Sequence, residues 1–254
     1  MNRFVTIRNS LLFWACTTGE PGVSVPGPCP AIGEGTIHVW SAQYSTLERY
    51  YPFLSGLISP EETMTAGGFK KPEDKRRYIL RHGLVRAVLG DYIHEDPEKI
   101  RFIQKGCGKP ELDVKGTCPD IRFSLSRTDE TVCLGLVRRS AIGLDIVKAD
   151  SRHPFSEIGQ YLFTGGERAW IAQAAPYLAS IRFFRIWALK EALLKATGGD
   201  VRVMKDADVS GIMTDTFLHG RYTIQMGKTD LQFFIHEACG NHRHHCAIAA
   251  SIGR

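Results

Sequence analysis

Residues 187–195 read Trp-Ala-Leu-Lys-Glu-Ala-Leu-Leu-Lys, and residues 142–146 read Ile-Gly-Leu-Asp-Ile. Taken alone, neither stretch predicts a site. Together they place two carboxylates, Asp145 and Glu191, and two lysine ammonium groups on elements that we expect to be rigid. These are the groups needed to hold a metal-bound diphosphate and to move a proton beside it.

The first stretch belongs to a helix predicted over residues 180–197, which the glycine pair at 198–199 ends. Its apolar stripe consists of Ile186, Leu189, Leu193 and Ala196. Trp187, Glu191 and Lys195 share a different face because they are four residues apart. An ordinary surface pair of glutamate and lysine has the same spacing, so the helix by itself favours that simpler interpretation.

The second stretch belongs to a predicted strand. Apolar alternation indicates strands over 132–137 and 141–147, which we expect to pair as a hairpin across 138–140. The two-residue period then turns Gly143 and Asp145 to the face opposite the apolar row. That row consists of Ile142, Leu144 and Ile146. A carboxylate in this place either caps a turn, faces water or serves a site, and the strand alone does not decide between these.

The same signals predict the remaining elements. These are a helix over 72–89, a helix from Thr164 to near Pro176 that begins with the capping-box pair Thr164 and Glu167, and strands over 36–40, 123–126, 222–226, 231–237 and 246–251. Because the order strand, helix, strands occurs twice, we expect an α+β protein of two similar halves related by a pseudo-twofold axis, with the active site in the cleft between them. The predicted domains are an irregular N-terminal extension (1–35), an N-terminal half (36–135) and a C-terminal half (136–254).

Composition and charge limit the class of protein. A chain of 254 residues, 43% of them hydrophobic, is long enough to bury a core, and its net charge of +5 is too small for a general nucleic-acid coat. Its seven cysteines are odd in number and scattered, which is typical of reduced thiols in a cytoplasmic protein. The apolar run at 11–16 is shorter than the core of a signal peptide, and no run reaches the roughly 20 residues of a membrane span. We therefore expect neither a signal nor a membrane span.

The paired stretches resemble the signature of the 4′-phosphopantetheinyl transferases, and the chain length favours the larger, monomeric Sfp type of that family. Three further segments agree in order. Residues 73–77 (Glu-Asp-Lys-Arg-Arg) are similar to the family's basic helix start, 108–110 (Gly-Lys-Pro) to its G-K-P loop, and 123–126 (Phe-Ser-Leu-Ser) to its F-N-x-S segment. Five ordered matches are more specific than any one motif.

The resemblance implies coenzyme A as the donor, Mg²⁺ as the metal, and a serine of an acyl or peptidyl carrier protein as the acceptor, with release of adenosine 3′,5′-bisphosphate. It implies that Asp145 and Glu191 ligate Mg²⁺, that Glu191 is also the candidate base, and that Lys195 contacts the diphosphate. The nucleotide and its 3′-phosphate would lie against Arg77, Lys109, Ser126 and Arg127.

The chain departs from the family's pattern at two positions. Val147 stands where many members carry a glutamate, so the protein supplies one metal ligand fewer. Arg127 stands where many carry a histidine, which replaces a titratable ring with a permanent cation. The tail at 239–246 contains cysteines and histidines, but its spacing fits no standard structural zinc site, and we expect a turn there between two strands.

Two other functions fit the same residues. One is a non-catalytic protein of the same fold that binds coenzyme A or a nucleotide. The other is a metal-dependent phosphohydrolase in which water replaces the serine. Neither the choice of carrier protein nor its pathway follows from the sequence.

Overall fold

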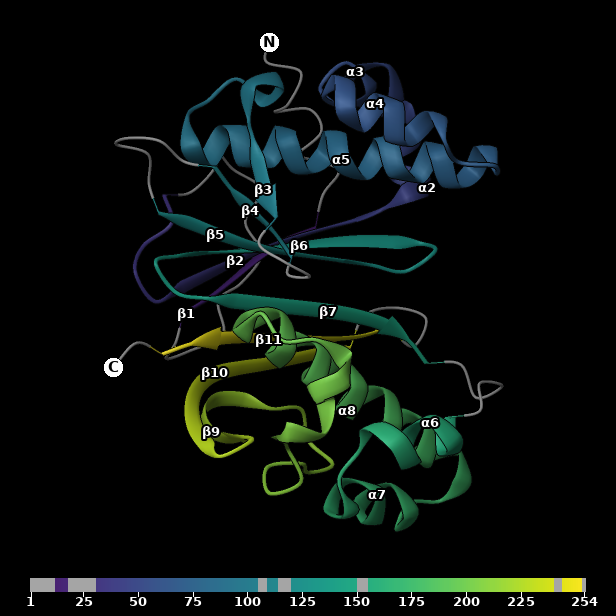
Figure 1. Cartoon of the computed structure of the whole chain (residues 1–254), viewed down its shortest axis with the longest axis vertical. Helices are drawn as coiled ribbons and strands as arrows, with labels where there is room; N and C mark the ends of the chain where they lie inside the picture. Colours follow the sequence, from purple (N-terminus) through teal and green to yellow (C-terminus); the bar gives the residue numbers. More distant parts are fainter. Residues whose placement is uncertain are drawn as a thin grey trace.

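The computed structural model describes residues 12–17, 31–104, 109–113, 120–149, 155–239 and 244–252. The protein combines helices with two larger sheets, so the α+β class is confirmed (Figure 1). The first sheet has the order β1-β2-β6-β5, with β1 (Leu12–Thr17), β2 (Thr36–Gln43), β5 (Ile121–Arg127) and β6 (Thr131–Arg138). The second has the order β7-β11-β10-β9-β8, with β7 (Ile142–Lys148), β8 (Ala207–Asp208), β9 (His219–Met226), β10 (Thr229–Cys239) and β11 (His244–Ser251).

Three short 3₁₀ helices cover Glu48–Tyr50, Pro97–Lys99 and Val201–Asp206. The α-helices and one small hairpin complete the described chain. They are α2 (Tyr44–Leu47), α3 (Tyr51–Ser55), α4 (Pro60–Gly67), α5 (Pro72–Ile93), β3 (Phe102–Gln104) with β4 (Pro110–Leu112), α6 (Phe155–Leu162), α7 (Gly165–Ala172) and α8 (Pro176–Thr197). In Figure 1, α5 lies over the first sheet, β7 and β11 lie below that sheet, and α8 packs on the second sheet.

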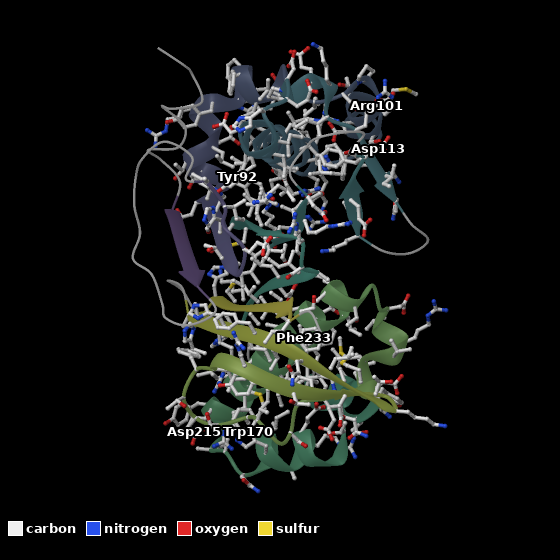
Figure 2. All side chains as sticks on the ribbon, turned by 90° about the vertical axis from the view of Figure 1, so that its left-hand side faces the viewer. Tyr92, Arg101, Asp113, Trp170, Asp215 and Phe233 are labelled. Atoms are coloured by element: carbon white, nitrogen blue, oxygen red, sulfur yellow. The ribbon has the colours of Figure 1, made fainter. Side chains whose placement is uncertain are left out.

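Three apolar clusters separate these layers. Leu80 of α5 packs with Leu134 of β6 in the first cluster, and Leu189 of α8 packs with Ala247 of β11 in the second. Figure 2 labels one member of each of these clusters, Tyr92 above and Phe233 below. The third cluster joins the facing sides of the two sheets and consists of Ile37, Val39, Cys133, Val137, Ile142, Leu144, Ile146, Phe234, Ile248 and Ala250. The layers therefore run helix, sheet, sheet, helix.

The expected hairpin of residues 132–137 and 141–147 is wrong. Strand β6 pairs with β2 on one side and β5 on the other, whereas β7 pairs with β11 in the second sheet. The chain changes sheets at Arg139, whose φ of 65° gives a left-handed turn. Because both edges of β6 are already occupied, β7 cannot join it and must pair elsewhere.

The helix predictions need smaller corrections. Thr164 caps α7 in a capping box with Glu167, as predicted, but α7 ends at Ala172. Pro176 does not end that helix; it is the first residue of α8, which therefore begins before the predicted residue 180. Proline suits this place because its missing N–H is unpaired at a helix start in any case. Gly198, with φ of 71°, caps the other end of α8 as predicted.

The N-terminal extension is not wholly irregular, contrary to the prediction for residues 1–35. Residues 12–17 form β1, which pairs antiparallel with β2. Pairing there satisfies backbone groups on a side of β2 that would otherwise be a free sheet edge. Residue 108 of the Gly-Lys-Pro segment and the predicted turn at 240–243 lie outside the described residues. Among the helices of the described ranges, none is long and apolar enough to cross a membrane.

The pKa of one carboxyl group between α4 and α5, that of Glu62, predicts how the stability of the fold depends on pH. Glu62 accepts hydrogen bonds from the Ser59 backbone N–H at 2.8 Å and the Arg86 Nε at 2.7 Å, and lies 2.9 Å from the His82 Nδ1. Burial raises the pKa of Glu62, but these bonds outweigh it and bring the pKa from 4.5 to about 2. A depressed pKa stabilises the fold above pH 4.5, and this contribution is lost as the pH falls towards 2.

We therefore expect the advantage of the wild type over Glu62→Gln to shrink by on the order of 3 kcal/mol between pH 6 and pH 2. Urea unfolding at a series of pH values measures this difference in the free energy of unfolding. Glu98→Gln, at an exposed position, is the control and should follow the wild type throughout. A constant difference between wild type and Glu62→Gln across the range would contradict the assigned pKa.

Candidate functional site

From Phe183 to Ala196, α8 is buried except along one face. Every residue from Phe183 to Ala196 is buried except Trp187, Glu191 and Lys195, which are partly exposed. The predicted shared face is therefore confirmed, and so is the burial of the apolar stripe on the other side. An ordinary solvated surface would expose more of the helix than this one line of residues.

Lys190, which precedes Glu191 on α8, anchors the helix on its buried side. Lys190 is fully buried, and its Nζ donates to Glu167 Oε1 at 2.9 Å and Oε2 at 2.7 Å. The Glu167 carboxylate also accepts the Val209 N–H at 3.0 Å and caps the start of α7. Since these bonds tie α8 to α7 and to the chain after β8, they set the rotation of the helix that carries Glu191.

Gly143 lets α8 approach β7 closely. A Cβ atom at this position would lie 1.7 Å from the Ala192 carbonyl oxygen and 2.6 Å from the Ala196 nitrogen. Both atoms are helix backbone, so they cannot rotate aside. The predicted strand register is confirmed, because Gly143 faces α8 while Leu144 packs between the sheets. Asp145, two residues further along, therefore also turns towards α8.

Asp145, Ser126 and Lys195 form a hydrogen-bonded cluster. The Lys195 Nζ lies 2.6 Å from Asp145 Oδ1, and the Ser126 hydroxyl donates to the same oxygen at 2.8 Å. Lys195 also donates to the Ser126 hydroxyl at 3.3 Å and to the Leu144 carbonyl at 3.1 Å. The carboxylate is 10% exposed and the lysine side chain 25%, so the cluster is sheltered and still reachable. Residues from β5, β7 and α8 thus meet at one point.

The carboxyl groups of Asp145 and Glu191 both have raised pKa values at this cluster. Burial raises the pKa of Asp145, although Lys195 and Ser126 oppose the shift. Burial also raises the pKa of Glu191, and the negative charge of Asp145 adds to it. A divalent cation relieves such repulsion, and Mg²⁺ commonly takes one or two carboxylates together with water and phosphate oxygens. The donor set therefore fits Mg²⁺, although the described residues contain no group of three or more His, Cys, Asp or Glu side chains able to hold a metal.

Predicted site residues line two separate cavities, and only one of the two is lined by a residue of this cluster. Arg77 lines one of about 610 Å³ together with Tyr44, Arg76 and Lys148. Lys195 lines another of about 350 Å³, as do Lys109 and Phe123. The predicted site residues therefore do not all line one cavity, since Arg77 lines the first and Lys109 and Lys195 line the second.

Although Lys109 lines this cavity, backbone oxygens already bind its ammonium group. Its ammonium donates to the carbonyl oxygen of Phe123 at 2.8 Å and to that of Ile142, and so bridges β5 to β7. Burial lowers its pKa to about 8. Val147 lies on the α8 side of β7, where it packs against the apolar cluster of the second sheet. Ile146, its neighbour, belongs instead to the cluster between the sheets.

Arg81 is a site candidate that the sequence reasoning missed. Burial lowers the pKa of Arg81, the neighbouring Tyr44 opposes this shift, and the positive charge of Arg127 adds to it. Arg127 is exposed at the end of β5, and the Arg81 guanidinium lies 5.3 Å from the Tyr78 ring centre. Arg81 lies four residues after Arg77 on α5, and this spacing was the signal in the sequence that could have revealed it. Two arginines on one helix face, such as Arg77 and Arg81, favour the binding of an anion.

Comparisons with known proteins match the chain to one family. A sequence model described as the 4′-phosphopantetheinyl transferase superfamily matches residues 141–249, which include β7 and α8. The chain is 25% identical over 174 residues to the 4′-phosphopantetheinyl transferase HetI of Nostoc sp., a match that covers 68% of this chain and 73% of that protein.

Other relatives carry similar names. The chain is 28% identical to the 4′-phosphopantetheinyl transferase gsp of Aneurinibacillus migulanus, over 58% of this chain and 59% of the relative. It is 29% identical to the 4′-phosphopantetheinyl transferase psf-1 of Bacillus pumilus, over 60% of this chain and 61% of the relative. These two matches span less than two thirds of either relative.

Proposed function

Because the chain belongs to the 4′-phosphopantetheinyl transferase superfamily and is a transferase, we propose that it moves the 4′-phosphopantetheine group of coenzyme A to a serine of an apo carrier protein. The acceptor is an acyl or a peptidyl carrier protein, and the second product is adenosine 3′,5′-bisphosphate. The observation that carries the proposal is the meeting of Asp145, Ser126 and Lys195 below the exposed line of α8.

Asp145 and Glu191 would hold Mg²⁺, which when bound supplies positive charge to the diphosphate of coenzyme A. Lys195 belongs beside that diphosphate, where its ammonium stabilises the charge that develops on the phosphoryl oxygens. In this structure the Lys195 ammonium lies 2.6 Å from the Asp145 carboxylate.

The serine oxygen of the carrier protein forms the new bond to the β-phosphorus. The bond that breaks joins this phosphorus to the oxygen that leaves with adenosine 3′,5′-bisphosphate. Glu191 takes the serine proton, directly or through one water molecule. A carboxylate held within reach of a hydroxyl can accept its proton as a general base.

The decisive experiment incubates the full-length protein with an apo carrier protein, coenzyme A and Mg²⁺, and records the carrier mass. We expect a mass gain equal to one phosphopantetheine group on the carrier. Release of adenosine 3′,5′-bisphosphate without a carrier would instead identify a phosphohydrolase. Binding of coenzyme A with neither product would identify a non-catalytic binding protein.

For the nucleotide, we propose that Arg77, Lys109, Ser126 and Arg127 hold it, with Arg127 and the neighbouring Arg81 nearest the 3′-phosphate. Arg127→Ala should then lower kcat/KM for coenzyme A by roughly 10-fold to 100-fold, because a hydrogen bond between charged groups contributes about 1.5–3 kcal/mol. Dephospho-coenzyme A lacks this phosphate and should be affected much less. The measurement is the ratio of kcat/KM for the two donors.

The matched control for this substitution is Arg202→Ala. Arg202 is an exposed arginine whose guanidinium pairs with Asp200 after α8. Its loss should leave the donor ratio unchanged. Equal losses for both donors in Arg127→Ala would contradict the assignment to the 3′-phosphate.

A further inference from the structure

The edge of β7 that faces away from β11 is bound by side chains rather than by another strand. Pairing with β11 aligns Gly143 with Ala249 and Asp145 with Ala247. On the opposite edge, the Leu144 N–H donates to the Ser124 hydroxyl at 3.0 Å, and the Ile146 N–H donates to the Ser126 hydroxyl at 3.2 Å. Two serines of β5 therefore replace the backbone partners that a neighbouring strand would supply.

The two serines reach β7 because of the two-residue period of β5. Phe123 packs with α5 on one side of the first sheet, so Ser124 and Ser126 project from the other side, towards β7. Their spacing matches that of Leu144 and Ile146. Ser124 is only 1% exposed, so water does not replace its hydroxyl as a partner for the Leu144 N–H.

The hydroxyl groups of Ser124 and Ser126 differ in their other contacts. The Ser126 hydroxyl also contacts Asp145 and Lys195 directly, and thus belongs to the site already described. The Ser124 hydroxyl accepts from the residue that immediately precedes Asp145. It fixes the backbone from which the carboxylate projects, on the side opposite the close contact between Gly143 and Ala192. The strand segment is therefore held from both sides.

We propose that Ser124 is a positioning residue, whose hydroxyl holds Leu144 against β5 and thereby sets the place of the Asp145 carboxylate for a divalent cation. This inference rests on the proposed role of Asp145 as a metal ligand. A buried N–H that loses its partner pulls away to find another, and a shift of the strand moves the carboxylate with it. Outer partners that orient metal ligands typically change metal affinity by 10-fold to 100-fold when they are removed.

The test uses the full-length chain and two measurements that need no enzymatic turnover. Amide hydrogen exchange by NMR reports on the Leu144 N–H, and titration with Mn²⁺ followed by electron paramagnetic resonance reports the metal affinity. We expect Ser124→Ala to speed exchange at Leu144 by about tenfold or more and to raise the Kd for Mn²⁺ by about tenfold. The Mg²⁺ concentration needed for half-maximal transfer should rise by the same factor.

Ser251→Ala is the matched control. The Ser251 hydroxyl accepts the Ala141 N–H at 3.0 Å, so a backbone-to-serine bond is also lost beside β7, but at an exposed position away from Asp145. This variant should keep the wild-type Kd for Mn²⁺. If Ser124→Ala does not fold, Ser124→Cys replaces it, since a thiol has similar size and is a much weaker acceptor.

An unchanged Kd for Mn²⁺ in the folded Ser124 variant would overturn the proposal, and so would an equal loss of affinity in Ser251→Ala. These results are distinct from a failure of the proposed function, which the wild-type transfer assay reports separately. A purely structural role for Ser124 would lower the melting temperature without moving the metal affinity.

Discussion

Gly143→Ala is expected to lower the free energy of unfolding by about 3 kcal/mol or more, which is the upper range for inserting a methyl group into a packed interior. The added Cβ would lie 1.7 Å from the Ala192 carbonyl oxygen, so α8 must move away from β7 or the strand must bend. Thermal unfolding should show a melting temperature lower by roughly 10 °C. The site should suffer as well, because Asp145 and Lys195 meet across this same contact.

Gly165→Ala provides the control for this prediction. Gly165 is the first residue of α7, and a Cβ atom added there meets nothing within 4 Å. The substitution should leave stability unchanged or raise it slightly, because alanine restricts the unfolded chain. A melting temperature for Gly143→Ala equal to that of this control would mean that α8 does not pack against β7 at residue 143.

Glu191→Gln should slow transfer by roughly 100-fold or more at saturating Mg²⁺ and coenzyme A, with the fold intact. Glutamine keeps the size of the side chain but cannot accept the serine proton, and a general base typically contributes 10²–10⁴-fold to a rate. Glu191 is also expected to ligate the cation, so the Mg²⁺ requirement should rise. Initial rates of carrier modification across a series of Mg²⁺ concentrations measure both effects.

Glu157→Gln is the corresponding control for the loss of one helical carboxylate. Glu157 is exposed in the first turn of α6, an element separate from the three that carry Ser126, Asp145 and Lys195. Its turnover should equal that of the wild type. Near-normal turnover in Glu191→Gln at saturating Mg²⁺ would exclude this residue as the base.

The helix bearing the site is an element whose main features follow from sequence alone. The spacing of Trp187, Glu191 and Lys195 predicts one face, and between Phe183 and Ala196 the structure leaves only these three residues partly exposed. The cap at Gly198 and the capping box at Thr164 were equally predictable. All of these depend on residues within one or two helical turns, where the backbone geometry fixes which side chains meet.

Strand pairing was predicted less well. A short link at 138–140 between two apolar runs is typical of a hairpin, yet β6 and β7 lie in different sheets. The partner of β7 is β11, about one hundred residues later in the chain. Because any apolar strand offers similar backbone groups, its partner depends on which sheet faces can be buried together, and local sequence does not specify that.

By itself, the sequence determined the family resemblance, the α+β class, the faces of α8 and β7, and the residue types of the candidate site. The tertiary structure alone decided that Ser126, Asp145 and Lys195 meet, that Lys109 bridges two carbonyl groups, and that serine hydroxyls of β5 bind the free edge of β7. The physical reason is distance along the chain. Helical faces arise within a few residues, whereas hydrogen bonds between separate strands form only once both sheets are packed.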